Sequence, residues 1–331
     1  MKSTKEQLLQ IQEKLNDLID SDATQEDAIR EVNEILKGLG YSIQPAKDFV
    51  AENERILNEW REKYIKENQP LYPTCQNLGE YFAKDGIMFM GDIVDEPKVY
   101  TNGDHTFRWK REESGMENEL WTKAPLRILY LTKDQNTGND VAWDVRSESF
   151  RYADEKYKPA DMWLDTTVTF FRNIVYSLYG IGNTTAERTA IDFTNEKALE
   201  YADNHIFARI NCKKEVGGAT CSNDILKKAI DRDNKYLKEQ IDNLDADIFI
   251  CCGYSQSIEK TGSLILNFLN DNGYSFQPEI DEWIYYDKEK NKIAINSWHL
   301  SDFRRFDYSE IVLKYHEFLK KHPTFIESHR E

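Results

Sequence analysis

From Leu126 onward, short continuous apolar runs alternate with longer segments that repeat apolar residues at helical spacing. Such runs are typical of strands buried on both faces, and the longer segments of helices that cover them. The expected strands are 127–132, 206–211, 247–252, 283–286 and 292–295, and the expected helices are 163–179, 222–244, 258–270 and 308–320. The alternation predicts an α/β domain over residues 125–331, in three α/β/α layers around a mostly parallel central sheet.

The N-terminal third carries helical patterns without strands. Thr4 and Gln7 fit a capping box, Thr24 suits a second helix start, and a third helix is expected over about 48–66. We interpret residues 1–70 as a helical N-terminal extension, either a packing element or a surface for a protein partner. Glycines and prolines punctuate residues 71–124, which we interpret as a mixed connecting segment.

The composition narrows the class of protein. The 331 residues include 40% hydrophobic residues, which supports a sizeable core, and carry a formal net charge of -16. An acidic chain repels nucleic acid at long range, although local basic patches can still bind it. No apolar run of about 20 residues is present, so no membrane span is expected. The polar start and five irregularly spaced cysteines indicate reduced thiols in a cytoplasmic protein.

Polar side chains stand where three of the expected strands end. Asp134 follows the first strand, Asn211 ends the second, and His299 follows the last. Ligands of open α/β sheets bind at the carboxyl ends of the strands, so these residues are candidates for one site. The carboxylate could act as a base or cap a turn, the amide could read a nucleobase edge or satisfy a loop, and the imidazole could stabilise a departing anion or be structural.

Other candidates flank these three residues. Lys213 precedes a glycine pair and could contact phosphate, or form a solvated edge. Ser301 and Arg304 could also contact phosphate, or simply begin a helix. Trp143 and Phe150 could stack on a planar ligand, or pack as a lid on the core.

Several common motifs are missing from the sequence. It contains no Gly-rich dinucleotide or P-loop fingerprint, no HExxH or CxxC pair and no serine-hydrolase elbow. We therefore expect neither a metal nor a cofactor.

Taken in order, the strand-exit segments resemble the uracil-DNA glycosylase superfamily over about Leu126 to Arg305. The loop Asp134-Gln-Asn136 stands at the place of the family's first loop, and Asn211 at the end of its second strand. Gln240 to Gly253 matches the passage from helix to third strand, and Trp298-His299-Leu-Ser301 stands for the last loop.

The resemblance implies a hydrolase that breaks an N-glycosidic bond, without a cofactor, to release a base from DNA in repair. Asp134 would help water reach the sugar, and His299 would stabilise the departing base. The remaining family roles would fall to Asn211 for the base edge, Trp143 or Phe150 for stacking, Ser301 for a phosphate, and Asn136 at the aromatic barrier position. Such enzymes flip the base out of a duplex.

Two alternatives to an enzyme stay open. The acidic charge, and loops that lack the family's Gly and Pro residues, favour a non-catalytic relative that binds a nucleotide or small ligand. The N-terminal helices suit an interaction protein that recruits a partner through them.

Overall fold

The computed structural model describes residues 47–95, 109–137, 141–150, 166–218, 221–254, 263–302 and 305–329. The chain divides into Met1–Asp48 and a compact unit, Phe49–Glu331. The first two helices expected in the N-terminal extension lie outside the described residues.

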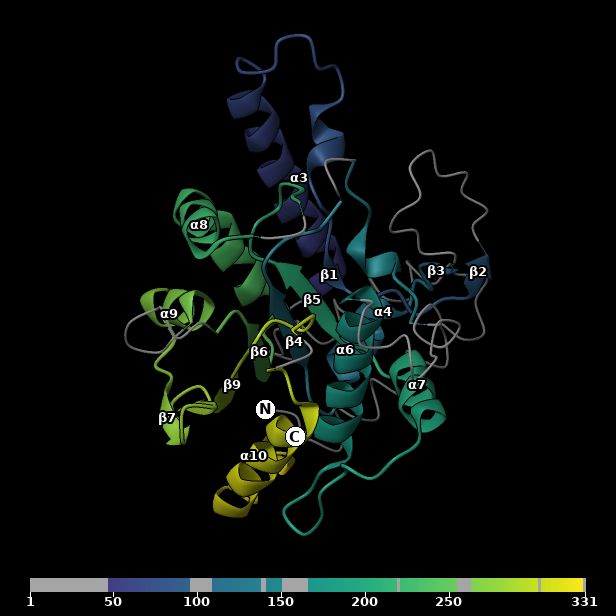
Figure 1. The fold of residues 1–331 in the computed structure, drawn as a ribbon, viewed down its shortest axis with the longest axis vertical. Coiled ribbons are helices and arrows are strands. Elements are labelled where there is room, and N and C mark those ends of the chain that lie inside the picture. The colour runs from purple at the N-terminus through teal and green to yellow at the C-terminus, as the bar shows by residue number, and fades with distance from the viewer. Residues whose placement is uncertain are drawn as a thin grey trace, which may run out of the picture. The chain divides into compact units, whose positions relative to one another are not determined.

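A seven-stranded sheet forms the centre of the compact unit, in the order β1-β5-β4-β6-β9-β8-β7 (Figure 1). Its strands are β1 (Gly86–Ile87), β4 (Ile128–Thr132), β5 (Ala208–Asn211), β6 (Ile248–Cys252), β7 (Gln277–Ile280), β8 (Ile284–Asp287) and β9 (Lys292–Ser297). The four inner strands β5, β4, β6 and β9 run parallel. The outer pairs β1/β5, β9/β8 and β8/β7 are antiparallel, and β1 and β7 form the two edges. The expected parallel sheet is confirmed for these inner strands. In a separate two-stranded sheet, β2 (Ile93–Asp95) pairs antiparallel with β3 (Trp109–Arg111).

Helices cover both faces of this sheet. They are α3 (Phe49–Asn68), α4 (Glu117–Lys123), α6 (Thr166–Asn183), α7 (Asn195–Asn204), α8 (Asn223–Leu244), α9 (Leu264–Asp271) and α10 (Tyr308–Lys321), with short 3-10 turns at Leu78–Tyr81, Val145–Ser147 and Glu327–His329. Figure 1 shows α8 and α9 on one side of the strands and α6 on the other. Side-chain caps fix several starts; Ser222, for example, accepts a hydrogen bond from the Ile225 backbone N–H.

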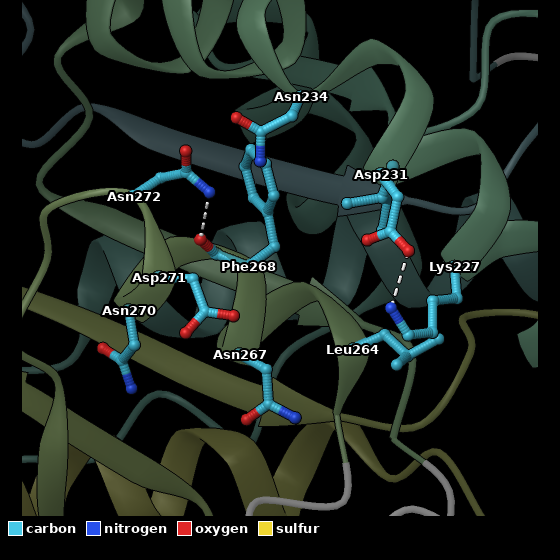
Figure 2. A pocket seen from close by; sticks show the side chains of 10 residues that line it. Lys227, Asp231, Asn234, Leu264, Asn267, Phe268, Asn270, Asp271 and Asn272 are labelled. Atoms are coloured by element: carbon cyan, nitrogen blue, oxygen red, sulfur yellow. Dashed lines mark hydrogen bonds and ion pairs between the residues drawn. The ribbon is translucent and has the colours of Figure 1, made fainter.

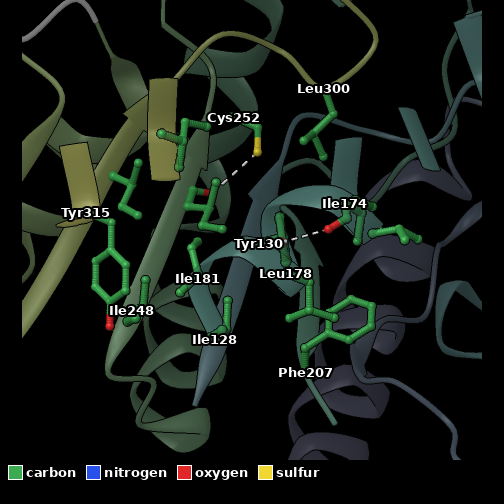
Figure 3. Packing of buried hydrophobic residues seen from close by; sticks show 14 of the residues in the cluster. Ile128, Tyr130, Ile174, Leu178, Ile181, Phe207, Ile248, Cys252, Leu300 and Tyr315 are labelled. Atoms are coloured by element: carbon green, nitrogen blue, oxygen red, sulfur yellow. Dashed lines mark hydrogen bonds between the residues drawn. The ribbon is translucent and has the colours of Figure 1, made fainter. Parts of the chain in front are cut away.

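Alternate residues of the inner strands point into two separate cores, as the period of two requires. On one face, Ile128 and Tyr130 of β4 pack against α6 residues such as Leu178 (Figure 3). On the other, Leu129 packs with residues from α3, α8 and α9, including Trp60. The arrangement is consistent with a three-layer α/β fold, and α3, expected as part of the N-terminal extension, packs within it.

A buried polar cluster ties α3, β1, α8 and the segment after β5 together. Lys214 Nζ lies 2.5 and 2.7 Å from the two carboxylate oxygens of Asp85. Gln240 Nε2 of α8 donates to the same carboxylate at 2.9 Å, and Asn53 of α3 donates to the Asp85 carbonyl. Lys214 and Asp85 are almost entirely buried. The pair therefore holds elements that are far apart in the sequence.

Two helices were not expected from the sequence: α4, in the connecting segment, and α7, in the α/β region. Both are short and polar, and α7 depends on Thr194, which caps its first turn. Among the described helices, none combines the length and apolar character that crossing a membrane requires.

Candidate functional site at the carboxyl edge of the sheet

The inner strands end at one edge of the sheet. Thr132 of β4 pairs with Asn211 of β5, and Cys252 of β6 pairs with Ser297 of β9. The segments that carry Asp134, Lys213 and His299 therefore leave the sheet on the same side, as the strand pattern predicted. This is the edge at which parallel sheets bind ligands.

Asp134 is held by the segment that follows the neighbouring strand β5. Its carboxylate lies 3.0 Å from Lys213 Nζ, and both side chains are about nine-tenths buried. Lys213 also donates to the backbone oxygen of Glu215 at 2.6 Å. Burial raises the pKa of Asp134, whereas Lys213 and Lys133 oppose that rise. The carboxylate is thus desolvated but charge-paired, a setting in which small changes alter its ionisation.

Gly217 lies against the Asp134–Lys213 ion pair, which occupies the space that a side chain at residue 217 would fill. The loops run side by side, with Gly217 N–H donating to the Gln135 carbonyl and Thr137 N–H to the Gly217 carbonyl. A Cβ atom on Gly217 would lie 2.4 Å from Asp134 Oδ2 and 3.2 Å from Lys213 Nζ. The glycine therefore allows the close approach of the backbone to the ion pair.

Gly217→Ala is expected to destabilise the protein by about 1–3 kcal/mol, because the methyl group overpacks the Asp134–Lys213 pair. Gly218→Ala is the matched control, since a Cβ there meets no atom within 4 Å. Urea unfolding of both variants measures the difference. Equal stabilities for the two variants would contradict this description of the loop.

Asn211 is fully buried at the end of β5. Its Oδ1 accepts a hydrogen bond from Thr132 Oγ1 at 2.7 Å, and its backbone N–H donates to Asp85. Its Nδ2 is buried without a hydrogen-bond partner in the described part of the chain. The amide therefore keeps one unused donor, which lies inside the fold and not on an open surface.

His299 follows β9 and is fixed by Ser301. Nδ1 of the imidazole lies 2.7 Å from Ser301 Oγ and also accepts from the Ser301 backbone N–H at 3.3 Å. Because Nδ1 accepts, the proton of the neutral ring is placed on Nε2, which can donate to a ligand. Burial lowers the pKa of His299 to about 4, and the cations Lys133 and Arg209 contribute. The ring is therefore neutral near pH 7.

This pKa has a consequence for stability. Between pH 6.5 and about 4 the unfolded chain binds a proton at His299 that the folded chain does not. The free energy of unfolding should therefore fall as pH decreases through this window, and His299→Gln should remove that part of the slope. Urea unfolding at a series of pH values measures it; an unchanged slope in the variant would show that the folded imidazole is not depressed.

A buried ion pair beneath the edge was not expected from the sequence. Arg209 of β5 pairs with Glu148, which also accepts from Trp143 Nε1 at 2.7 Å. The Arg209 guanidinium lies 4.6 Å from the ring centre of Phe170, and that ring lies 5.9 Å from the His299 ring. A charged residue inside the apolar run Ile206–Ile210 was the signal that could have revealed this pair.

The structure places the remaining predicted site residues in different surroundings. Phe150 is 4% exposed and packs against Phe171 and Phe207 in the core, so the structure offers it no open face for stacking. Asn136 is exposed and pairs through its backbone with Gly217. The backbone of Trp143 is held by the Gln135 side chain. Arg304 lies outside the described residues.

The structure brings these residues into two groups at one edge. Asp134, Lys213 and Asn211 belong to the exits of β4 and β5, and His299 with Ser301 to the exit of β9. Strand β6 lies between β4 and β9, which puts the two exits about 10 Å apart. In the described chain no hydrogen bond or ion pair joins Asp134 to His299, although Lys133 acts electrostatically on both. A ligand that touches both groups would therefore have to reach across the exit of β6.

Metal chemistry has no support among the described residues, which contain no group of three His, Cys, Asp or Glu side chains able to hold an ion. Burial raises the pKa of Cys212, just after β5, and of Cys252, at the end of β6, so both remain thiols at neutral pH.

Two cavities of the described chain are lined by neither Asp134, Asn211 nor His299. One of about 360 Å³ lies between α8 and α9, where Lys227 is bonded to Asp231 and the Asn234 amide lies beside Phe268 (Figure 2). A second, of about 670 Å³, reaches Lys213.

The comparisons with known proteins add no relative. No protein-family model matches the chain, and a search of curated proteins finds no match.

Proposed function

We propose that the protein is a divergent uracil-DNA glycosylase-like hydrolase that releases a base by breaking an N-glycosidic bond. The observation that carries the proposal is the common edge of β4, β5 and β9, which bears Asp134, Asn211 and His299. The order of these segments along the chain is that of the family the sequence resembles. The α/β layers with a parallel centre are compatible with that fold.

The proposed chemistry needs positioned charges more than covalent catalysis. As the bond to the base breaks, positive charge develops on the sugar and negative charge on the base. An ionised Asp134 would stabilise the sugar and orient water, and the Nε2–H of neutral His299 would donate to the base oxygen. The unused Nδ2 of Asn211 would donate to the base edge. Lys133, whose charge also acts on Asp134, would attract the DNA backbone.

The test is base release from single-stranded and mismatched oligonucleotides that contain uracil. We expect free uracil and an abasic strand, and about a 100-fold loss of rate in His299→Ala. His322→Ala is the matched control, because that imidazole lies after α10 and bonds to Glu279. Release of no base, or equal rates in His299→Ala and wild type, would contradict the proposal. Thermal stabilisation by nucleotides without release would favour the binding-only relative.

A further inference from the structure

A groove that is not lined by Asp134, Asn211 or His299 meets the proposed site only at Lys213. It has a volume of about 670 Å³ and is formed by the end of α3, the segment after it, the loop after β5 and the first half of α8. Small-molecule sites usually enclose about 300–1,000 Å³, so the groove has the size of a nucleotide-sized ligand.

One wall of the groove is aromatic. Tyr64, Tyr72 and Tyr81 all line it, and Tyr72 is 56% exposed. Burial and the nearby Glu215 carboxylate raise the pKa of Tyr64 to about 12, so its hydroxyl stays protonated and can donate. Exposed tyrosine rings provide flat surfaces on which a planar ring can stack.

Two cations of α8 also line the groove. Lys228 and Arg232 lie one helical turn apart, and Lys228 is exposed with no ion-pair partner among the described residues. Arg232 is held by Glu215 and Asp233 but keeps 42% of its side chain exposed. The groove thus combines one cation unpaired in the described chain, Lys228, and one partly exposed, paired cation, Arg232, with aromatic rings. Lys228 and Arg232 would attract an anion at their end of the groove, although the Glu215 carboxylate also lines it and is paired with Arg232.

We infer that this groove binds a nucleotide, with the base stacked on the tyrosines and the phosphate at Lys228 and Arg232. A simple anion would not need the aromatic wall, and an apolar ligand would not need the cations. The inference goes beyond the proposed function, since it requires no bond to be broken. The same chemistry belongs to a free nucleotide and to one unit of a single strand.

The test measures binding by titration calorimetry with nucleoside monophosphates, the parent nucleosides, inorganic phosphate and a short single-stranded oligonucleotide. Lys228→Gln should weaken binding of the monophosphate about tenfold or more, since it removes a charge-assisted contact. Tyr72→Ala should weaken it by a similar factor through lost stacking. Lys227→Gln is the matched control, because that neighbouring lysine is bonded to Asp231 and lines the other cavity.

Wild-type affinity in Lys227→Gln, with weakened binding in the two groove variants, supports the inference. It is overturned if wild type binds no nucleotide, if Lys228→Gln binds as tightly as Lys227→Gln, or if phosphate alone binds as tightly as the monophosphate. Tighter binding of the oligonucleotide identifies a strand as the source, and tighter binding of the monophosphate a free nucleotide. His299→Ala should keep nucleotide binding, so the loss of base release in that variant is a separate result.

Discussion

Asp85→Ala is expected to destabilise the protein by about 3–5 kcal/mol, the cost of removing one partner of a buried ion pair. The substitution leaves Lys214 charged, 1% exposed and without its carboxylate. Burial already lowers the pKa of Lys214, and Asp85 is the main group that opposes this shift. The same carboxylate accepts from Gln240 and from the Asn211 backbone, so three elements lose a hydrogen bond together.

Urea unfolding monitored by circular dichroism measures this loss. Asp231→Ala is the matched control, since its pair with Lys227 is exposed and should contribute about 0.5 kcal/mol or less. The double variant with Lys214→Met and Asp85→Leu should recover part of the stability, because an apolar pair leaves no unpaired buried charge. A loss in Asp85→Ala no larger than in Asp231→Ala would show that the buried pair does not hold these elements.

Asp134→Asn is expected to lower the rate of base release by about 10²- to 10⁴-fold, the usual contribution of a positioned acid or base. The amide keeps the shape of the side chain but removes the charge that would stabilise the sugar. Single-turnover release from a single-stranded uracil oligonucleotide measures the effect, with Asp231→Asn as a control on an exposed carboxylate. An unchanged rate in Asp134→Asn would remove this residue from the mechanism.

Lys213→Gln tests whether the ionisation of Asp134 controls the rate, because it changes the pKa of Asp134 and leaves the carboxyl group in place. Lys213 holds the pKa of Asp134 down against burial, so its loss should raise that pKa. The ionised form would then be lost at higher pH, and the acid limb of the pH–rate profile should move upward. An acid limb that stays in place would mean that another group controls the profile.

Much of the fold could be predicted from the sequence because burial on both faces leaves a local signal. All five residues of β4 are buried and apolar or hydroxyl-bearing, and Ser222 marks the start of α8 as its position suggested. The two-residue strand β1 carries no such signal. It forms because Gly86 and Ile87 pair with β5, next to Asp85 and its buried cluster. These contacts join segments far apart in the sequence, so a local pattern cannot predict them.

Part of the candidate site could also be predicted from the sequence. Residues that follow parallel strands share an edge, and this placed Asp134, Lys213 and His299 at one end of the sheet. Phe150 could not be assigned, because a loop aromatic can face a ligand or the core, and here Phe171 and Phe207 provide core contacts. Arg209 was missed because it was interpreted as part of an apolar strand, although its charge required a buried partner.

The most direct test of the account is a crystal structure of the protein with a hydrolysis-resistant uracil oligonucleotide. We predict that the base lies between the exits of β4 and β9, with His299 Nε2 about 2.7–3.2 Å from a base oxygen and the sugar beside Asp134. A base bound away from both side chains, with His299 Nε2 turned toward protein instead, would contradict it.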